Sequence, residues 1–196
     1  MRIIETKAYT FDELSDDAKE KLIEKFREDK YEYLNLDYFY DDCVYQLEEL
    51  GFVNPKIQYS LGYCQGDGLS FEDDRYTSLE DLYIKELGKG KEHTAQVLAD
   101  NSTFICTGNK GHYCYSSTSD IDLYIENYSS TINTDCENIN NVVDIVRGEL
   151  EDLYVDICSN LEKQGYDEIE YQLSDECIIE DIQCNEYEFT KEGKLI

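Results

Sequence analysis

The chain of 196 residues has no tryptophan, a single proline and few basic residues. Its 17 Lys and Arg stand against 45 Asp and Glu, which gives a formal net charge of −28 at pH 7. This shortage of positive charge argues against nucleic acid and membranes as direct partners, because an acidic surface repels phosphate groups. The same surface attracts a basic cleft. No run approaches the ~20 apolar residues needed to cross a bilayer.

The usual catalytic motifs are also missing. The chain has no Gly-x-Ser-x-Gly element, no Walker loop and no Gly-x-Gly-x-x-Gly fingerprint. Carboxylates are so numerous that a pair of them has no diagnostic value. We therefore expect no enzymatic activity, no cofactor and no metal.

The eight cysteines form no Cys-x-x-Cys pair, which argues against a zinc ribbon or a thioredoxin-type site. The charged start, Met1 to Glu5, does not resemble a signal peptide and predicts a cytoplasmic location. We therefore expect reduced thiols rather than disulfides.

What the chain does contain is typical of a folded protein. Apolar residues make up 41% and there are 18 Tyr and 7 Phe, whereas disordered acidic segments have few aromatics. Apolar periodicity and capping residues predict helices at 11–30, 37–50, 139–165 and 174–184, and a less clear one within 79–98. Alternation and turn residues predict strands at 2–9, 56–63, 69–72, 103–107, 113–117, 120–126 and 187–189.

This order predicts a single acidic α+β domain over residues 1–196. We expect an antiparallel sheet with helices packed on one face and a long helix near the C-terminus. A capping box at Thr10 and Glu13 is expected to start the first helix, and Gly165 is expected to end the long one.

The long helix carries an acidic outer face opposite its apolar stripe. We predict that this face binds a partner through Asp144, Glu149, Glu151, Asp152 and Asp156. Asp120, Asp122 and Glu126, which alternate along the preceding strand, are expected to extend it.

A second candidate site is the turn Gln65-Gly66-Asp67-Gly68. Its two glycines permit a positive φ and place the Asp67 carboxylate on a tight turn, where it either binds a ligand or bonds its own backbone. His112, one of two histidines, either joins that site or makes a structural hydrogen bond. The spacing offers no recognisable set of metal ligands.

Several motifs carry a resemblance that spans nearly the whole chain. They are the segment from Tyr9 to Lys21, the turn Gln65 to Phe71, the Gly111-His112-Tyr113 element, and Cys177 to Ile182 followed by Asn185 to Thr190. Together they resemble an uncharacterised family of phage and prophage proteins. Leu69 departs from the alanine usual there, and the acidity is unusual. The resemblance implies an origin in a mobile element and no particular chemistry.

Charge and resemblance together suggest an anti-defence protein similar to anti-CRISPR inhibitors, acting in the infected bacterial host. Twenty-eight excess charges equal the phosphates of roughly fourteen base pairs. Such a protein would occupy the basic nucleic-acid-binding cleft of a CRISPR effector or nuclease. Two alternative functions stay open: a phage accessory or antitoxin-like binding module, and a ligand- or metal-binding protein centred on the Gln65–Gly68 turn. The acidic surface is also consistent with a role in solubility alone.

Overall fold

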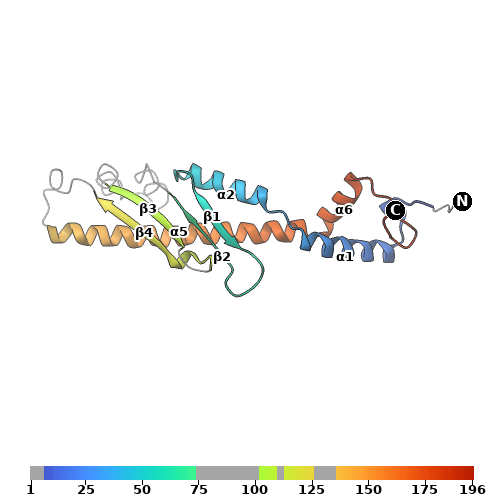
Figure 1. Ribbon diagram of the computed structural model, residues 1–196, viewed down its shortest axis with the longest axis horizontal. Coiled ribbons are helices and arrows are strands. Elements are labelled where there is room, and N and C mark those ends of the chain that lie inside the picture. Colours follow the sequence, from blue (N-terminus) through green and yellow to red (C-terminus); the bar gives the residue numbers. More distant parts are fainter. Residues whose placement is uncertain (1–6, 74–101, 110–112, 126–135) are drawn as a thin grey trace, which may run out of the picture. The chain divides into compact units, whose positions relative to one another are not determined.

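The computed structural model describes residues 7–73, 102–109, 113–125 and 136–196 (Figure 1). Its helices are α1 (Asp16–Glu32), α2 (Asp37–Glu49), α5 (Cys136–Gln172) and α6 (Asp175–Cys184), with short 3-10 turns η1 (Phe11–Glu13) and η2 (Ser116–Thr118). Its strands are β1 (Lys56–Ser60), β2 (Gly68–Glu72), β3 (Ser102–Asn109) and β4 (Ser119–Ile125). The fold is α+β with a long helix near the C-terminus, as predicted.

The chain divides into two compact units. The terminal unit contains residues 1–36 and 166–196, and the central unit contains residues 37–165. Helix α5 contributes to both, because the division falls between Gly165 and Tyr166. The expectation of one domain over the whole chain stays a prediction.

The terminal unit has an apolar core drawn from both ends of the chain. The side chains of α1 that point inward meet those of α6 and of the C-terminal segment. The buried members are Phe11, Leu14, Ala18, Leu22, Ile178, Ile182 and Phe189. Tyr9 and Phe189 add a two-bond backbone bridge, with N···O distances of 2.9 and 2.8 Å.

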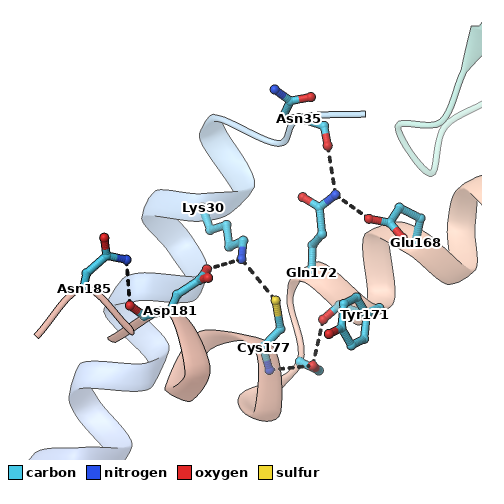
Figure 2. Close-up of polar contacts among 9 residues, drawn as sticks. Lys30, Asn35, Glu168, Tyr171, Gln172, Cys177, Asp181 and Asn185 are labelled. Atoms are coloured by element: carbon cyan, nitrogen blue, oxygen red, sulfur yellow. Dashed lines mark hydrogen bonds and ion pairs between the residues drawn. The ribbon is translucent and has the colours of Figure 1, made fainter. Parts of the chain in front are cut away.

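Polar contacts join the same elements of the terminal unit (Figure 2). The Lys30 ammonium of α1 pairs with Asp181 of α6 and donates to the Cys177 Sγ at 3.3 Å. Burial lowers the pKa of Lys30, but these two partners outweigh that effect and leave it raised. The Gln172 amide donates to the Asn35 carbonyl at 2.8 Å. These contacts fix α1 beside α6 and the last turn of α5.

The central unit contains two antiparallel strand pairs, β1 with β2 and β3 with β4. In the first pair Ile57 lies opposite Phe71 and Tyr59 lies opposite Leu69. Side chains alternate along a strand, so these four residues share one face.

Helices α2 and α5 cover that shared face (Figure 1). Phe39 of α2 packs edge-on against Tyr59, with ring centroids 5.6 Å apart. Tyr154 of α5 packs on Phe71 at 4.7 Å. The Gln46 amide of α2 donates to the Gln164 amide oxygen of α5 at 2.7 Å, which ties the two helices together.

Several predicted boundaries are wrong. The capping box forms, and in it the Thr10 N–H donates to the Glu13 carboxylate at 2.9 Å. It caps the N-terminal end of η1, however, and α1 begins later, at Asp16. Residues 113–117 are not a strand, and their end lies in η2. Segment 187–189 makes only isolated bridges through Phe189. The expected helix within 79–98 and most of the strand at 2–9 lie outside the described residues.

Helix α5 also continues beyond its expected end, through Gly165 to Gln172. A Cβ at position 165 would lie 2.5 Å from Leu61 Cδ1 and 2.8 Å from Phe39 Cζ. A side chain at position 165 would therefore force Leu61 and Phe39 to shift, and the glycine does not terminate the helix.

Candidate functional site

The predicted acidic face of α5 is exposed where the structure describes it. Asp144, Glu151, Asp152 and Asp156 are exposed, and Glu149 is half-buried. At about 100° per residue the four exposed carboxylates fall on one side of the helix, opposite the buried Val146, Leu150 and Leu153. The sequence therefore placed these side chains correctly with respect to the core.

Few positive charges accompany this face. Between Asp144 and Gly165 the only exposed base is Lys163, and Arg147 is half-buried. Arg147 lies 3.8 Å from Asp144, whose side chain is 73% exposed. An ion pair this long and this exposed neutralises little of the local negative potential.

The expected extension of this face along a strand is described only in part. Asp120 and Asp122 lie in β4 and share one face of it by the two-residue period. Their side chains and all of Glu126 are outside what the structure describes. Their contribution to the acidic face stays a prediction.

The Gln65–Gly68 turn is organised around Asp67. One carboxylate oxygen accepts from the Ser60 hydroxyl at 2.9 Å and from the Cys64 thiol at 3.2 Å. The other oxygen accepts from the Cys64 backbone N–H at 2.9 Å. Asp67 thus bonds to its own loop, as expected if the turn is structural and does not bind a ligand. The side chain of Gln65 is exposed.

The two glycines of this turn pack against the segment Tyr113 to Cys114, which leaves no room for a side chain at either position. Gly66 has φ 108°, and a Cβ there would lie 2.5 Å from the Tyr113 ring. A Cβ at Gly68 would lie 2.8 Å from the Cys114 carbonyl oxygen. Two of the elements that carry the resemblance therefore pack directly on each other. His112 lies outside the described residues.

The negative charge of Asp67 raises the pKa of two neighbouring groups. The pKa of Glu162 on α5 is raised by burial and by the negative charge of Asp67. The pKa of the Cys114 thiol is raised for the same two reasons. Within the described part of the chain no three His, Cys, Asp or Glu side chains are grouped so that they could hold a metal ion.

The buried thiols are held in their neutral form. Burial raises the pKa of Cys43 and of Cys158 to about 12. Neither sulfur is a thiolate near neutral pH, and the thiolate is the nucleophilic form. Six cysteines are free among the described residues, Cys43, Cys64, Cys114, Cys158, Cys177 and Cys184.

Sequence reasoning missed a second charged surface, on α2. All seven exposed residues of this helix are acids or tyrosines: Asp37, Tyr38, Asp41, Asp42, Tyr45, Glu48 and Glu49. We call this set the α2 face. The sequence could have predicted this face, because its residues lie on the side of the helix opposite the apolar stripe of Phe39, Cys43 and Leu47.

No helix among the described residues is both long enough and apolar enough to cross a membrane. Comparison of the chain with family models, curated proteins and solved structures returned no match.

Proposed function

We propose that this protein inhibits a host defence system by occupying the basic nucleic-acid-binding surface of a CRISPR effector or nuclease. The observation that supports the proposal is the exposed side of α5, with Asp144, Glu151, Asp152 and Asp156 against the single exposed base Lys163. Carboxylates bind the same arginine and lysine side chains that phosphates bind. The negative net charge of the chain would steer it toward a basic cleft.

The charge density of α5 sets what the helix alone can do. At 1.5 Å per residue, Asp144 and Asp156 lie about 18 Å apart along the axis, with roughly one exposed carboxylate per 5 Å. One strand of B-form DNA carries a phosphate every ~3.4 Å. The helix therefore offers roughly two-thirds of the density of one strand, and the partner must also meet other acidic elements.

Single contacts of this kind are weak. An exposed ion pair contributes about 0.2–1 kcal/mol, because solvent screens both charges. Tight binding by this mechanism requires many pairs at once, and its affinity must fall steeply as salt rises. The proposal therefore predicts strong salt dependence and fast association.

A matched pair of variants tests the proposal. In the first, Asp144, Glu151, Asp152 and Asp156 are replaced by their amides. In the control, four exposed acids of α1 (Asp16, Asp17, Glu20 and Glu28) are replaced in the same way, so that the net charge changes equally. Affinity for a purified guide-loaded CRISPR effector is measured at low and at moderate salt.

We expect the α5 variant to lose at least ~10-fold more affinity than the α1 variant, and its loss to shrink as salt rises. Equal losses would mean that net charge alone matters. A salt-independent affinity would remove mimicry as the mechanism. Recovery of a phage protein, instead of a host nuclease, by affinity capture from infected cells would favour the accessory-module alternative.

A further inference from the structure

The α2 face combines exposed carboxylates with exposed tyrosine rings, whereas the exposed side of α5 from Asp144 to Asp156 has carboxylates and no exposed tyrosine. Tyr38 is 85% exposed and Tyr45 is 60% exposed, although tyrosine rings gain free energy when they are buried. The two tyrosines are seven residues apart, so they stand two turns apart on the same line, separated by about 10.5 Å along the axis. They form the midline of the face.

Carboxylates flank this midline on both sides. At about 100° per residue, Asp37, Asp41 and Glu48 fall on one side and Asp42 and Glu49 on the other. The side chain of Asp42 accepts a hydrogen bond from the Gln46 amide at 2.8 Å, which orients it along the helix. From Asp37 to Glu49 the helix contains no Lys, Arg or His. An aromatic midline between two acidic rows thus contains every exposed residue of α2.

This combination discriminates between classes of partner. Nucleic acid is repelled by the carboxylates. An apolar helix would desolvate those carboxylates without pairing them, which costs free energy. A basic protein surface satisfies both features, because its cations pair with the acidic rows and its side chains cover the rings.

Arginine satisfies them better than lysine. A guanidinium stacks flat on an aromatic ring while its N–H groups bind a carboxylate in a bidentate manner. The lysine ammonium is a strongly hydrated point charge that pairs with carboxylates but stacks poorly. We propose that the α2 face is a docking surface for an arginine-bearing segment of a protein partner. The inference is independent of the role proposed for α5, because it concerns another helix and its test uses no defence protein.

Binding of two peptides of equal length, oligo-arginine and oligo-lysine, tests the inference on the full-length protein. Fluorescence anisotropy at moderate salt gives both affinities. We expect the arginine peptide to bind about 10-fold more tightly, since an aromatic contact with a desolvated cation adds roughly one factor of ten.

The tyrosines are then replaced in pairs. Tyr38→Ala with Tyr45→Ala should bring arginine binding down to the lysine level, whereas Tyr38→Phe with Tyr45→Phe should keep the preference because the rings remain. The matched control is Tyr31→Ala with Tyr33→Ala at the C-terminal end of α1, where both side chains are also exposed. The control should keep the preference, and circular dichroism verifies the fold of each variant.

A variant with fewer carboxylates separates the stacking of arginine on the tyrosine rings from the charge attraction that both peptides share. Asp41→Asn with Glu48→Gln should weaken both peptides by a similar factor and leave the preference for arginine in place. Equal affinity of the unmodified protein for the two peptides would overturn the inference. So would an equal loss in the α1 control pair, which would mean that any exposed tyrosine pair on this acidic protein suffices.

Discussion

At the scale of single residues, Tyr154 makes the most informative contact. Its ring is 2% exposed and packs on Phe71, and its hydroxyl bonds to the backbone of β2. The hydroxyl donates to the Phe71 carbonyl at 2.8 Å, accepts from the Phe71 N–H at 3.0 Å, and lies 3.0 Å from the Ser119 Oγ. One side chain thus satisfies both backbone groups of a buried strand residue.

We therefore predict that Tyr154→Phe lowers the free energy of unfolding by about 1–3 kcal/mol, because it leaves a buried donor and acceptor unsatisfied. Urea titration followed by circular dichroism measures the change. Tyr31→Phe removes a hydroxyl from an exposed ring of α1 and should change stability by less than ~0.5 kcal/mol. Similar effects of the two substitutions would show that the Phe71 contacts contribute nothing.

The buried thiols give a second prediction, on alkaline pH. In the folded protein the pKa of Cys43 is about 12, above the ordinary value of 9.0. Above pH 9 the unfolded thiol loses its proton while the folded thiol keeps it, so the unfolded state binds fewer protons and stability falls as pH rises. The contribution is fully present below pH 9 and is lost toward pH 12.

The measurement is the free energy of urea unfolding from pH 8 to pH 10.5. Tyrosine ionisation affects the unmodified protein and Cys43→Ala alike, so the difference in slope isolates the thiol. We expect a shallower fall in Cys43→Ala. Parallel slopes would show that Cys43 ionises equally in both states.

At the scale of elements, two glycines of α5 form a natural pair of controls. A Cβ at Gly148 would meet no atom within 4 Å, whereas at Gly165 it would meet Leu61 and the buried Phe39. Both substitutions by alanine gain the same helix propensity, about 1 kcal/mol. Only the surroundings differ.

We predict that Gly148→Ala raises the free energy of unfolding by about 0.5–1 kcal/mol and that Gly165→Ala lowers it by about 1–3 kcal/mol, because overpacking outweighs propensity. Urea midpoints of the two variants measure the contrast. If Gly165→Ala also stabilises the protein, Leu61 and Phe39 move aside easily and the close packing of α5 is not specific.

The same glycine shows where sequence reasoning succeeds and where it fails. Apolar spacing predicted α2, α5 and α6 because each helix has one strong stripe, and alternation predicted β1, β2 and β4. The end of α5 was missed because a glycine that stops a helix and a glycine that permits close packing look alike without the neighbours. The start of α1 was missed because a capping box satisfies a 3-10 turn as well as an α-helix.

In the candidate sites, too, some features could be predicted from the sequence and others could not. The exposed side of α5 was predictable, since exposure is the complement of the apolar stripe. The role of Asp67 in its own loop depends on Ser60 and Cys64, and the need for Gly66 and Gly68 depends on Tyr113 and Cys114. Such contacts between separate segments are set by tertiary packing, which local spacing does not encode.

At the scale of the whole chain, the terminal unit is a product of pairing between distant segments. Phe11, Leu14 and Leu22 pack with Ile178, Ile182 and Phe189, more than 150 residues away along the sequence. Arg27 of α1 pairs with Asp175 and donates to the Leu173 carbonyl at 3.0 Å, near the end of α5. Two amphipathic stripes were visible in the sequence, but nothing in it showed that they pack on each other.

Net charge governs the last prediction, which concerns salt. Twenty-eight excess negative charges repel one another in the folded state, and this repulsion lowers stability. Raising the ionic strength from about 0.01 M to 0.1 M shortens the screening length from about 30 Å to 10 Å, which weakens repulsion across the molecule. The few ion pairs of the described residues, such as Lys30 with Asp181, lose much less, because their atoms are in contact.

We therefore expect salt to act in opposite directions on folding and on binding. The free energy of unfolding should rise with sodium chloride, measured in urea because guanidinium is itself a salt. Over the same range the affinity for a basic partner should fall, since there screening removes attraction. A protein whose stability falls with salt would be held together by its ion pairs, and its carboxylates would then be engaged within the fold and unable to replace phosphates.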